Sequence, residues 1–464
     1  MSATKPVTEQ FDFETDPRLA LSASAKRVQF AADSDEYRLG SVCEIRIPNG
    51  ANTLLDPSGS TLSLEISGGI TGTAISDATI RMPWIGVNAL IDDLSVRVGG
   101  NTVQHNTNYN VLYATLSALN RDVNSFAVSS VMDGGAGGGS TADNEFMGML
   151  EGQNVATKFN YTGTTIGELK TSLKFEIPLL GLLSGSSKML PLGLLNSDVV
   201  VRIRWAPSIF DLFYISDDST AHSLAASNTI SIKNVKFNAK VVSVSDYGMT
   251  AIRRASGVSP SRPLSWSSTG WCSDFKTLNA SFLNSSVPNT NTITVGGLHP
   301  RSVNGIFCTG ISAAESSAQA KFELIYPGFR TQFRIHGALF PPEEIENTAN
   351  HIALAQLAAH QDGVTTLANL FSHDASRFDE AAAGRVRKVG VAFNDEMTQR
   401  GVMGLALGGV SGQGVDTSGG VIETTVTCKK VGTDDAVTGI QLFTLLRYRQ
   451  LYSISDDGEM TVAQ

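Results

Sequence analysis

The chain has 464 residues, of which 42% are hydrophobic and 17% are charged, and its formal net charge is −9. This length exceeds what one hydrophobic core usually spans, so we expect two domains. Because a phosphate backbone is bound by clustered Lys and Arg, the negative charge argues against specific nucleic-acid binding. The 44 glycines favour turns and short strands over long helices.

The beginning of the chain predicts an arm followed by strands. Residues 1–38 mix charged residues with Ser and Ala without sustained periodicity, so we predict an N-terminal arm that acts in assembly rather than in folding. Alternating apolar side chains then predict strands at 42–47 and 61–67, joined by a turn at 54–59.

A hairpin, a helix and a loop are predicted next. The Gly99-Gly100 pair joins two candidate strands, 90–98 and 101–104, and is typical of a hairpin turn. Apolar residues at three- and four-residue spacing predict an amphipathic helix over 108–120. Glycine repeats predict a flexible surface loop over 133–140.

The stretch 175–205 contains two apolar blocks, each with a proline, and ends in a strand. Pro178 and Pro191 lack backbone donors, so the blocks are predicted to form a buried irregular crossing. Leu190 and Leu192 are predicted to be buried there. In 199–205 a period of two predicts a half-buried strand. Its buried face is predicted to carry Val199, Val201, Ile203 and Trp205, and its other face Arg202 and Arg204.

A further strand over 230–244 is predicted to have a bulge near Asn234, where its alternation slips. Turn-forming and charged residues then indicate a boundary between domains. The second half again predicts short strands, at 276–282, 291–295, 303–309, 322–326, 331–335, 421–428, 441–449 and 452–461. Two helices are predicted after Pro341-Pro342, over 343–360 and 364–371. The expected organisation is therefore an arm (1–38), a first β-sandwich (39–248), a linker (249–268) and a second β-sandwich (269–464).

Several stretches resemble the double jelly-roll major capsid proteins of viruses, of the PRD1/adenovirus-like lineage. The likeness lies in Ile177-Pro178-Leu179 with Leu190-Pro191-Leu192, in Ile45-Arg46-Ile47-Pro48 followed by Leu55-Asp56, in the Asp416-Thr-Ser-Gly419 turn, and in Tyr448-Arg449 followed by Asp457-Gly458. In size the chain looks most similar to capsid proteins of virophages and polinton-like viruses.

The resemblance implies an all-β fold of two tandem antiparallel jelly rolls with short helices in loops. It also implies a homotrimeric, pseudo-hexameric capsomer that tiles the icosahedral capsid of a DNA virus. Expected partners are other copies of the chain, neighbouring capsomers, and penton and minor capsid proteins, while an internal membrane stays open. Residues 1–18 have no apolar segment typical of a secretory signal, so synthesis is expected in the host cytoplasm or nucleus.

The sequence indicates no enzyme and no catalytic, cofactor-binding or metal-binding residues. Residues 137–142 match a loose G-x-G-x-x-A pattern, but no predicted strand precedes them as dinucleotide binding requires. His351 and His360 are too far apart along a helix to share a metal. Carboxylates Glu343, Glu344 and Glu346 suit a helix N-terminus. The cysteines are far apart in sequence and are interpreted as buried free thiols, at Cys43, Cys272, Cys308 and Cys428.

Two alternatives stay open at this point. A carbohydrate-binding or carbohydrate-processing β-sandwich would need paired carboxylates and exposed aromatic side chains in a cleft. A minor virion protein would have one jelly roll and an unrelated second domain. The number of sandwiches distinguishes the latter from the first hypothesis.

Overall fold

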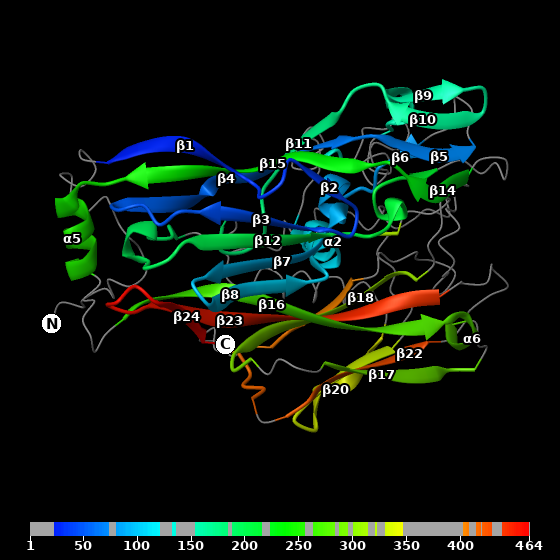
Figure 1. Cartoon of the computed structure of the whole chain (residues 1–464). Coiled ribbons are helices and arrows are strands. Elements are labelled where there is room, and N and C mark those ends of the chain that lie inside the picture. The colour runs from blue at the N-terminus through cyan, green and yellow to red at the C-terminus, as the bar shows by residue number, and fades with distance from the viewer. Residues whose placement is uncertain are drawn as a thin grey trace, which may run out of the picture.

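In the computed structural model the described residues form mainly antiparallel strands, which are arranged in stacked sheets (Figure 1). The structure describes residues 23–73, 80–120, 132–135, 154–183, 188–215, 223–255, 263–283, 287–295, 300–313, 321–322, 330–346, 402–407, 414–418, 420–428 and 439–463.

Two main sheets form the centre of the first half. One sheet has the order β1 (Ser24–Ala31), β15 (Ser231–Ser243), β4 (Thr53–Ser67) and β11 (Leu173–Ile177), with β2 (Glu36–Arg38) also paired to β15. The other has the order β3 (Val42–Ile47), β12 (Val199–Trp205), β7 (Ile91–Val98) and β8 (Asn101–Thr107). Smaller sheets join β14 (Ser223–Asn228), β5 (Gly69–Thr73), β10 (Thr165–Leu169) and β9 (Phe159–Thr162), and β13 (Tyr214–Ile215) with β6 (Ile80–Arg81).

The second half contains two further sheets. The first has the order β16 (Leu264–Asn279), β23 (Gly439–Ile454), β18 (Val303–Ser312) and β21 (Val402–Ala406), with β24 (Met460–Ala463) also paired to β23. The second has the order β17 (Asn289–Val295), β22 (Ile422–Cys428), β19 (Arg330–Ile335) and β20 (Ala338–Glu346). Described helices are α2 (Tyr109–Asn120), α5 (Asp246–Ala255) and α6 (Ala280–Leu283), and short 3-10 turns are η1 (Gly86–Leu90), η2 (Ala156–Lys158), η3 (Leu192–Leu194) and η4 (Ile209–Asp211).

Both halves have the same strand order. The main strands of the first half, numbered one to eight along the chain, are β1, β3, β4, β7, β8, β11, β12 and β15, and those of the second half are β16 to β23. In each half one sheet then has the order 1-8-3-6 and the other 2-7-4-5. This is the arrangement of a jelly roll, an eight-stranded sandwich of two sheets. The second half is therefore a second jelly roll and not an unrelated domain.

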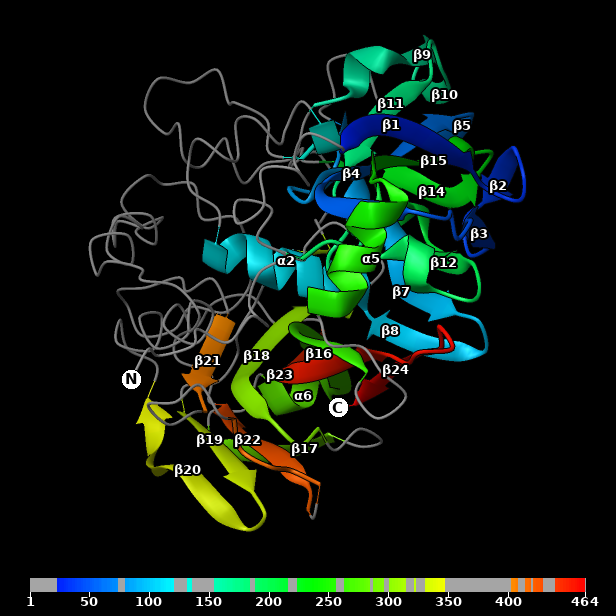
Figure 2. The same ribbon diagram turned by 90° about the vertical axis from the view of Figure 1, so that its left-hand side faces the viewer.

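The 1-8-3-6 sheet of the second half is buried on both faces. Along β18, Ile306 and Cys308 belong to the internal core of the second jelly roll, whereas Phe307 and Ile311 belong to the core cluster of the first half. Successive side chains of a strand point to opposite faces, so the outer face of this sheet packs against the first jelly roll. Figure 2 shows α2 between β18 and the first-half strands.

Strand β12 and the crossing before it agree with the sequence predictions. In β12, Val199, Val201, Ile203 and Trp205 are fully buried and alternate with more exposed residues. Leu190 and Leu192 are buried as predicted. Between β11 and β12 the described residues form only η3 and an isolated bridge, in which Leu55 and Leu190 exchange backbone hydrogen bonds of 2.8 and 2.9 Å.

Other sequence predictions for the first half are also confirmed. The hairpin is β7 and β8, with Gly99 at φ +60°. The predicted helix is α2, which begins one residue late because Asn108 has φ +51° and cannot continue a helix. The bulge near Asn234 is present, since the β15 to β4 register shifts between Lys233 and Lys236.

The N-terminal part of the chain differs from the predicted arm. Residues 24–31 form β1, paired with β15 along its whole length, and residues 36–38 form β2 on the same strand. The second half of the predicted arm is thus the first strand of the jelly roll. The periodicity is weak there because β1 lies at the sheet edge, where only Val28 and Phe30 pack partly against the core.

Two predicted connections are also different. The turn expected at 54–59 is a bulge inside β4, where Asn238 pairs with Thr61 and Lys240 with Asp56. The expected linker, 249–268, contains most of α5 and the start of β16. Helix α5 forms because Ser245 Oγ accepts a hydrogen bond from Gly248 N, and because Met249 and Ile252, three residues apart, are buried.

The helix predicted from residue 343 is wrong at its start, because residues 338–346 form strand β20, so Glu343, Glu344 and Glu346 lie on a strand. Strand β20 is at the end of its sheet, and an edge strand tolerates Pro341 and Pro342. Residues 347–360 and the helix predicted over 364–371 lie outside the described residues, as do 323–326 of one predicted strand. The loop predicted over 133–140 is not a surface loop at its start, since Asp133, Gly134 and Gly135 are buried.

Candidate assembly surfaces

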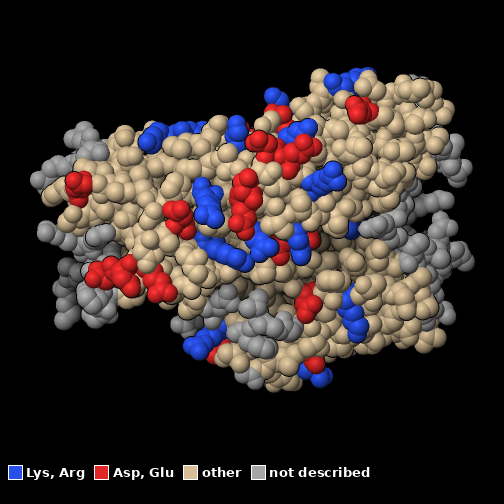
Figure 3. All heavy atoms as spheres, viewed as in Figure 1, with Lys and Arg blue, Asp and Glu red and all other residues tan. Residues whose placement is uncertain are grey.

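The outer face of the 2-7-4-5 sheet of the first half carries a row of charges. Arg204 on β12 contacts Asp92 at 2.8 Å and Asp93 at 3.9 Å, both on β7. His105 on β8 contacts Asp93, with 2.9 Å between Nε2 and Oδ2. These four residues, called the charge row below, follow from the antiparallel register, which sets β7 between β12 and β8. In Figure 3 side chains of both signs lie close together across this part of the surface.

The charge row is open to solvent. The side chains of Arg204 and His105 are each 52% exposed. Exposed ion pairs contribute little to folding stability, so the row adds little to holding the sheet together. The hydrogen bond to Asp93 raises the pKa of His105 above its ordinary value, against the opposing effects of burial and of Arg204 and Arg97.

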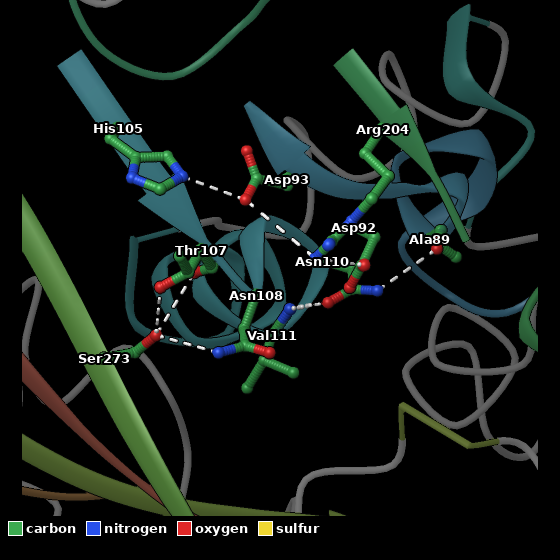
Figure 4. Close-up of polar contacts among 10 residues, drawn as sticks. All are labelled: Ala89, Asp92, Asp93, His105, Thr107, Asn108, Asn110, Val111, Arg204 and Ser273. Atoms are coloured by element: carbon green, nitrogen blue, oxygen red, sulfur yellow. Dashed lines mark hydrogen bonds and ion pairs between the residues drawn. The ribbon is translucent and has the colours of Figure 1, made fainter. Parts of the chain in front are cut away.

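A group of hydrogen bonds joins the two jelly rolls beside the outer 2-7-4-5 face of the first (Figure 4). Ser273 on β16 donates from Oγ to the carbonyl oxygen of Thr107 at 3.1 Å, and Asn108 Nδ2 donates to Ser273 Oγ at 3.1 Å. Asn108 is in the left-handed region, which turns its side chain toward β16 just before α2 begins. The contact therefore fixes the edge strand β8 against the edge strand β16.

A second contact between the halves comes from the turn before β24. Asn196 N donates to the Gly458 carbonyl oxygen at 3.0 Å, and Asn101 Nδ2 donates to Glu459 Oε1 and to the Met460 carbonyl oxygen, both at 3.0 Å. Gly458 has φ +83°, and a Cβ there would lie 2.7 Å from Asn196 N. Glycine is thus required both by the turn and by the close approach of the first jelly roll.

Comparison with known proteins relies on structure alone, since no protein-family model and no curated protein matches the chain. A chain of the Sputnik virophage is similar with a TM-score of 0.59 and 13% identity, over 95% of this chain and 88% of that chain. The mavirus major capsid protein is similar with a TM-score of 0.57 and 13% identity, over 94% and 89%. The Faustovirus major capsid protein is similar with a TM-score of 0.55 and 8% identity, over 93% of this chain and 91% of that chain.

The chain has the double jelly-roll fold of these capsid proteins. The resemblance inferred from the sequence is thereby confirmed for the fold, and the match extends over both jelly rolls.

The outer face of the 1-8-3-6 sheet of the first jelly roll is polar, unlike its counterpart in the second. Lys174 contacts Glu65 at 3.3 Å, Lys240 contacts Asp56 at 2.7 Å, and Arg27 on β1 pairs with Glu176 on β11. Equivalent faces of the two jelly rolls therefore differ: one is apolar and covered within the chain, and the other is hydrophilic and uncovered by the described residues.

The residues considered for chemistry are placed as follows. The cysteines are buried free thiols, as predicted, and burial raises the pKa of Cys43, Cys272 and Cys428 to about 12. His351, His360 and residues 137–142 lie outside the described residues. Within the described part of the chain, no group of three His, Cys, Asp or Glu residues could hold a metal ion. None of the described helices has the length and hydrophobicity needed to cross a membrane.

Proposed function

We propose that this chain is a viral major capsid protein that forms homotrimeric, pseudo-hexameric capsomers, which tile the icosahedral shell of a DNA virus. The observation that carries the proposal is the repeated strand order, 1-8-3-6 and 2-7-4-5, which gives one chain two jelly rolls of the same topology. The similarity to the mavirus and Faustovirus major capsid proteins over more than nine-tenths of the chain supports it. The protein is accordingly assigned to the virion, after synthesis in the host cytoplasm or nucleus.

The proposed contact between copies repeats the packing inside one chain. The β8 and α2 side of the first jelly roll covers the outer 1-8-3-6 face of the second. Because the jelly rolls are topologically equivalent, the β20 side of the second jelly roll can cover the polar 1-8-3-6 face of the first in another copy. Such head-to-tail contacts close a ring when the rotation is right. A polar face suits a contact between chains that fold separately.

The charges on the surface support structural partners over substrates. The outer 2-7-4-5 face of the first jelly roll is left uncovered by the contact within the chain, so it is assigned to contacts with neighbouring capsomers or with penton and minor capsid proteins. The proposed capsid role requires no enzymatic activity. The charge row contains both signs, which does not favour specific binding of a nucleic acid.

The carbohydrate-protein alternative has less support. It would need paired carboxylates in a cleft, but Asp92 and Asp93 lie on strand β7 and are ion-paired with the basic residues Arg204 and His105. Residues arranged in this way are poor candidates for general acid and base chemistry.

The proposal is tested on the purified full-length protein. Light scattering is expected to give about three times the chain mass at micromolar concentration, and negative-stain electron microscopy is expected to show hexagonal particles. A monomer at that concentration, with particles of no hexagonal outline, would contradict it.

A further inference from the structure

Two residues between β18 and β19, Lys321 and Phe322, extend from the second jelly roll into the first. Phe322 is fully buried and belongs to the apolar cluster that joins the core of the first half to the interface side of the second, whereas Phe333 on β19 belongs to the separate core of the second. The Phe322 side chain thus adds to the apolar packing between the two jelly rolls.

Polar contacts at two different places accompany this insertion. Trp84, between β6 and η1, donates from Nε1 to the carbonyl oxygen of Phe322 at 2.8 Å. Lys321 forms an ion pair with Asp211 at the end of η4, where the Asp211 side chain is 2% exposed and that of Lys321 22%. Lys321 and Phe322 therefore contact two separate places in the first half, the connection before η1 and the end of η4.

These contacts are directional, as are the hydrogen bonds that Ser273 and Asn101 make between the two halves. The apolar contact around Phe307 and Phe443 is favourable in many relative positions, because the hydrophobic effect has no preferred direction. A buried carboxylate, in contrast, is costly unless its partner is in place. The ion pair of Lys321 with Asp211 and the hydrogen bond from Trp84 to Phe322 therefore both depend on how the two jelly rolls are oriented.

We propose that Lys321 and Phe322 form a latch that fixes the angle between the two jelly rolls. The latch is a property of the single chain. Its value for assembly rests on the proposed function, because a ring of equivalent jelly rolls closes only if every angle between neighbours is the same.

The experiment measures the angle in the full-length protein. Spin labels are attached at Gln29→Cys on β1 and Thr294→Cys on β17, which are exposed positions in different jelly rolls, while the native cysteines are buried. Labelled protein is diluted with unlabelled protein, and the distance distribution is measured by pulsed electron paramagnetic resonance. We expect one narrow distribution for the native latch, and a broadened or shifted one for Phe322→Ala, Lys321→Met and Asp211→Asn.

Matched controls separate the latch from general loss of stability. Phe333→Ala removes an equally buried phenylalanine from the core of the second jelly roll alone, and Asp56→Asn removes a carboxylate paired with Lys240 inside the first. Both controls are expected to keep the narrow distribution.

Unchanged distributions in all latch variants would overturn the proposal. So would global unfolding of all three while the controls stay folded, because the residues would then serve core stability and not orientation. The measurement needs neither a trimer nor a shell, so its failure is distinguishable from failure of the capsid proposal.

Discussion

Leu192 shows what a single residue contributes to the crossing before β12. It is 2% exposed, next to Pro191, and lies in the cluster that fills the first jelly roll. We expect Leu192→Asp to cost several kcal/mol, because an unpaired charge would be buried. Chemical denaturation measures this. Leu451→Asp, at a leucine that is 44% exposed, should change stability little, and equal losses for both would show that the Leu192 environment is not apolar.

His105 provides a pH-dependent prediction at the same scale. Its pKa is raised in the folded state by Asp93, so its contribution to stability is complete below the unfolded value near 6.5 and is lost as the pH rises through the folded pKa. We expect an NMR titration of His105 to have its midpoint above 6.5, and Asp93→Asn to lower that midpoint. Because the side chain is half exposed, the effect on stability should be small. A midpoint that Asp93→Asn leaves unchanged would contradict the pairing.

The sequence predicts buried residues better than it predicts their partners. A period of two was sufficient to assign both faces of β12, since it needs only local information. The Asp93 to His105 contact depends on a bulge between Val96 and Arg97, which sets Ser95 opposite His105 and Asp93 opposite Thr107. Nothing in the local pattern indicates that shift, so the charge row could not be predicted.

At the scale of elements, the contribution of β1 to the stability of the first jelly roll can be tested directly. It covers the edge of β15, and only Val28 and Phe30 pack partly against the core. A chain that begins at Asp35 should have a Tm several degrees lower and a greater tendency to aggregate, because the backbone groups of β15 become an open edge. A chain that begins at Ala23 keeps β1 and is the control. Equal Tm values for the two would show that β1 does not contribute to the first jelly roll.

Two elements were predicted wrongly because residues adjacent in sequence are typical of a different structure from the one that forms. Pro341-Pro342 followed by glutamates is typical of a helix start, yet β20 pairs with β19 at the end of a sheet, where prolines and charges are tolerated. Asp56 does make the local hydrogen bond that is typical of a turn, since its Oδ1 accepts from Ser58 N at 3.0 Å. The residues before and after this contact nevertheless pair with the same strand, β15, and only the strand register shows this.

At the scale of the molecule, local patterns indicate two sandwiches but do not determine how the strands pair. Most neighbours in each sheet are far apart in sequence, as with β1 and β15. The resemblance supplied what periodicity could not, namely the jelly-roll order. The burial of both faces of β18 likewise depends on the first jelly roll covering the second, which no single strand encodes.

The proposed ring leads to a prediction that separates two outer faces. Ser63 on β4 lies on the polar 1-8-3-6 face of the first jelly roll, which we expect a second copy to cover, whereas Thr425 on β22 lies on the 2-7-4-5 face of the second, which the ring leaves free. Both side chains are half-buried on outward strand positions, so Ser63→Arg and Thr425→Arg are matched.

An arginine at Ser63 would place bulk and charge inside the contact, while a single chain can direct it into solvent. We expect Ser63→Arg to reduce the mass measured by light scattering from trimer to monomer with little change in Tm, and Thr425→Arg to stay trimeric. The reverse result would mean that the copies join through the opposite sheets. A Ser63→Arg protein that remains trimeric would show that the contact between copies is not a repeat of the contact inside the chain.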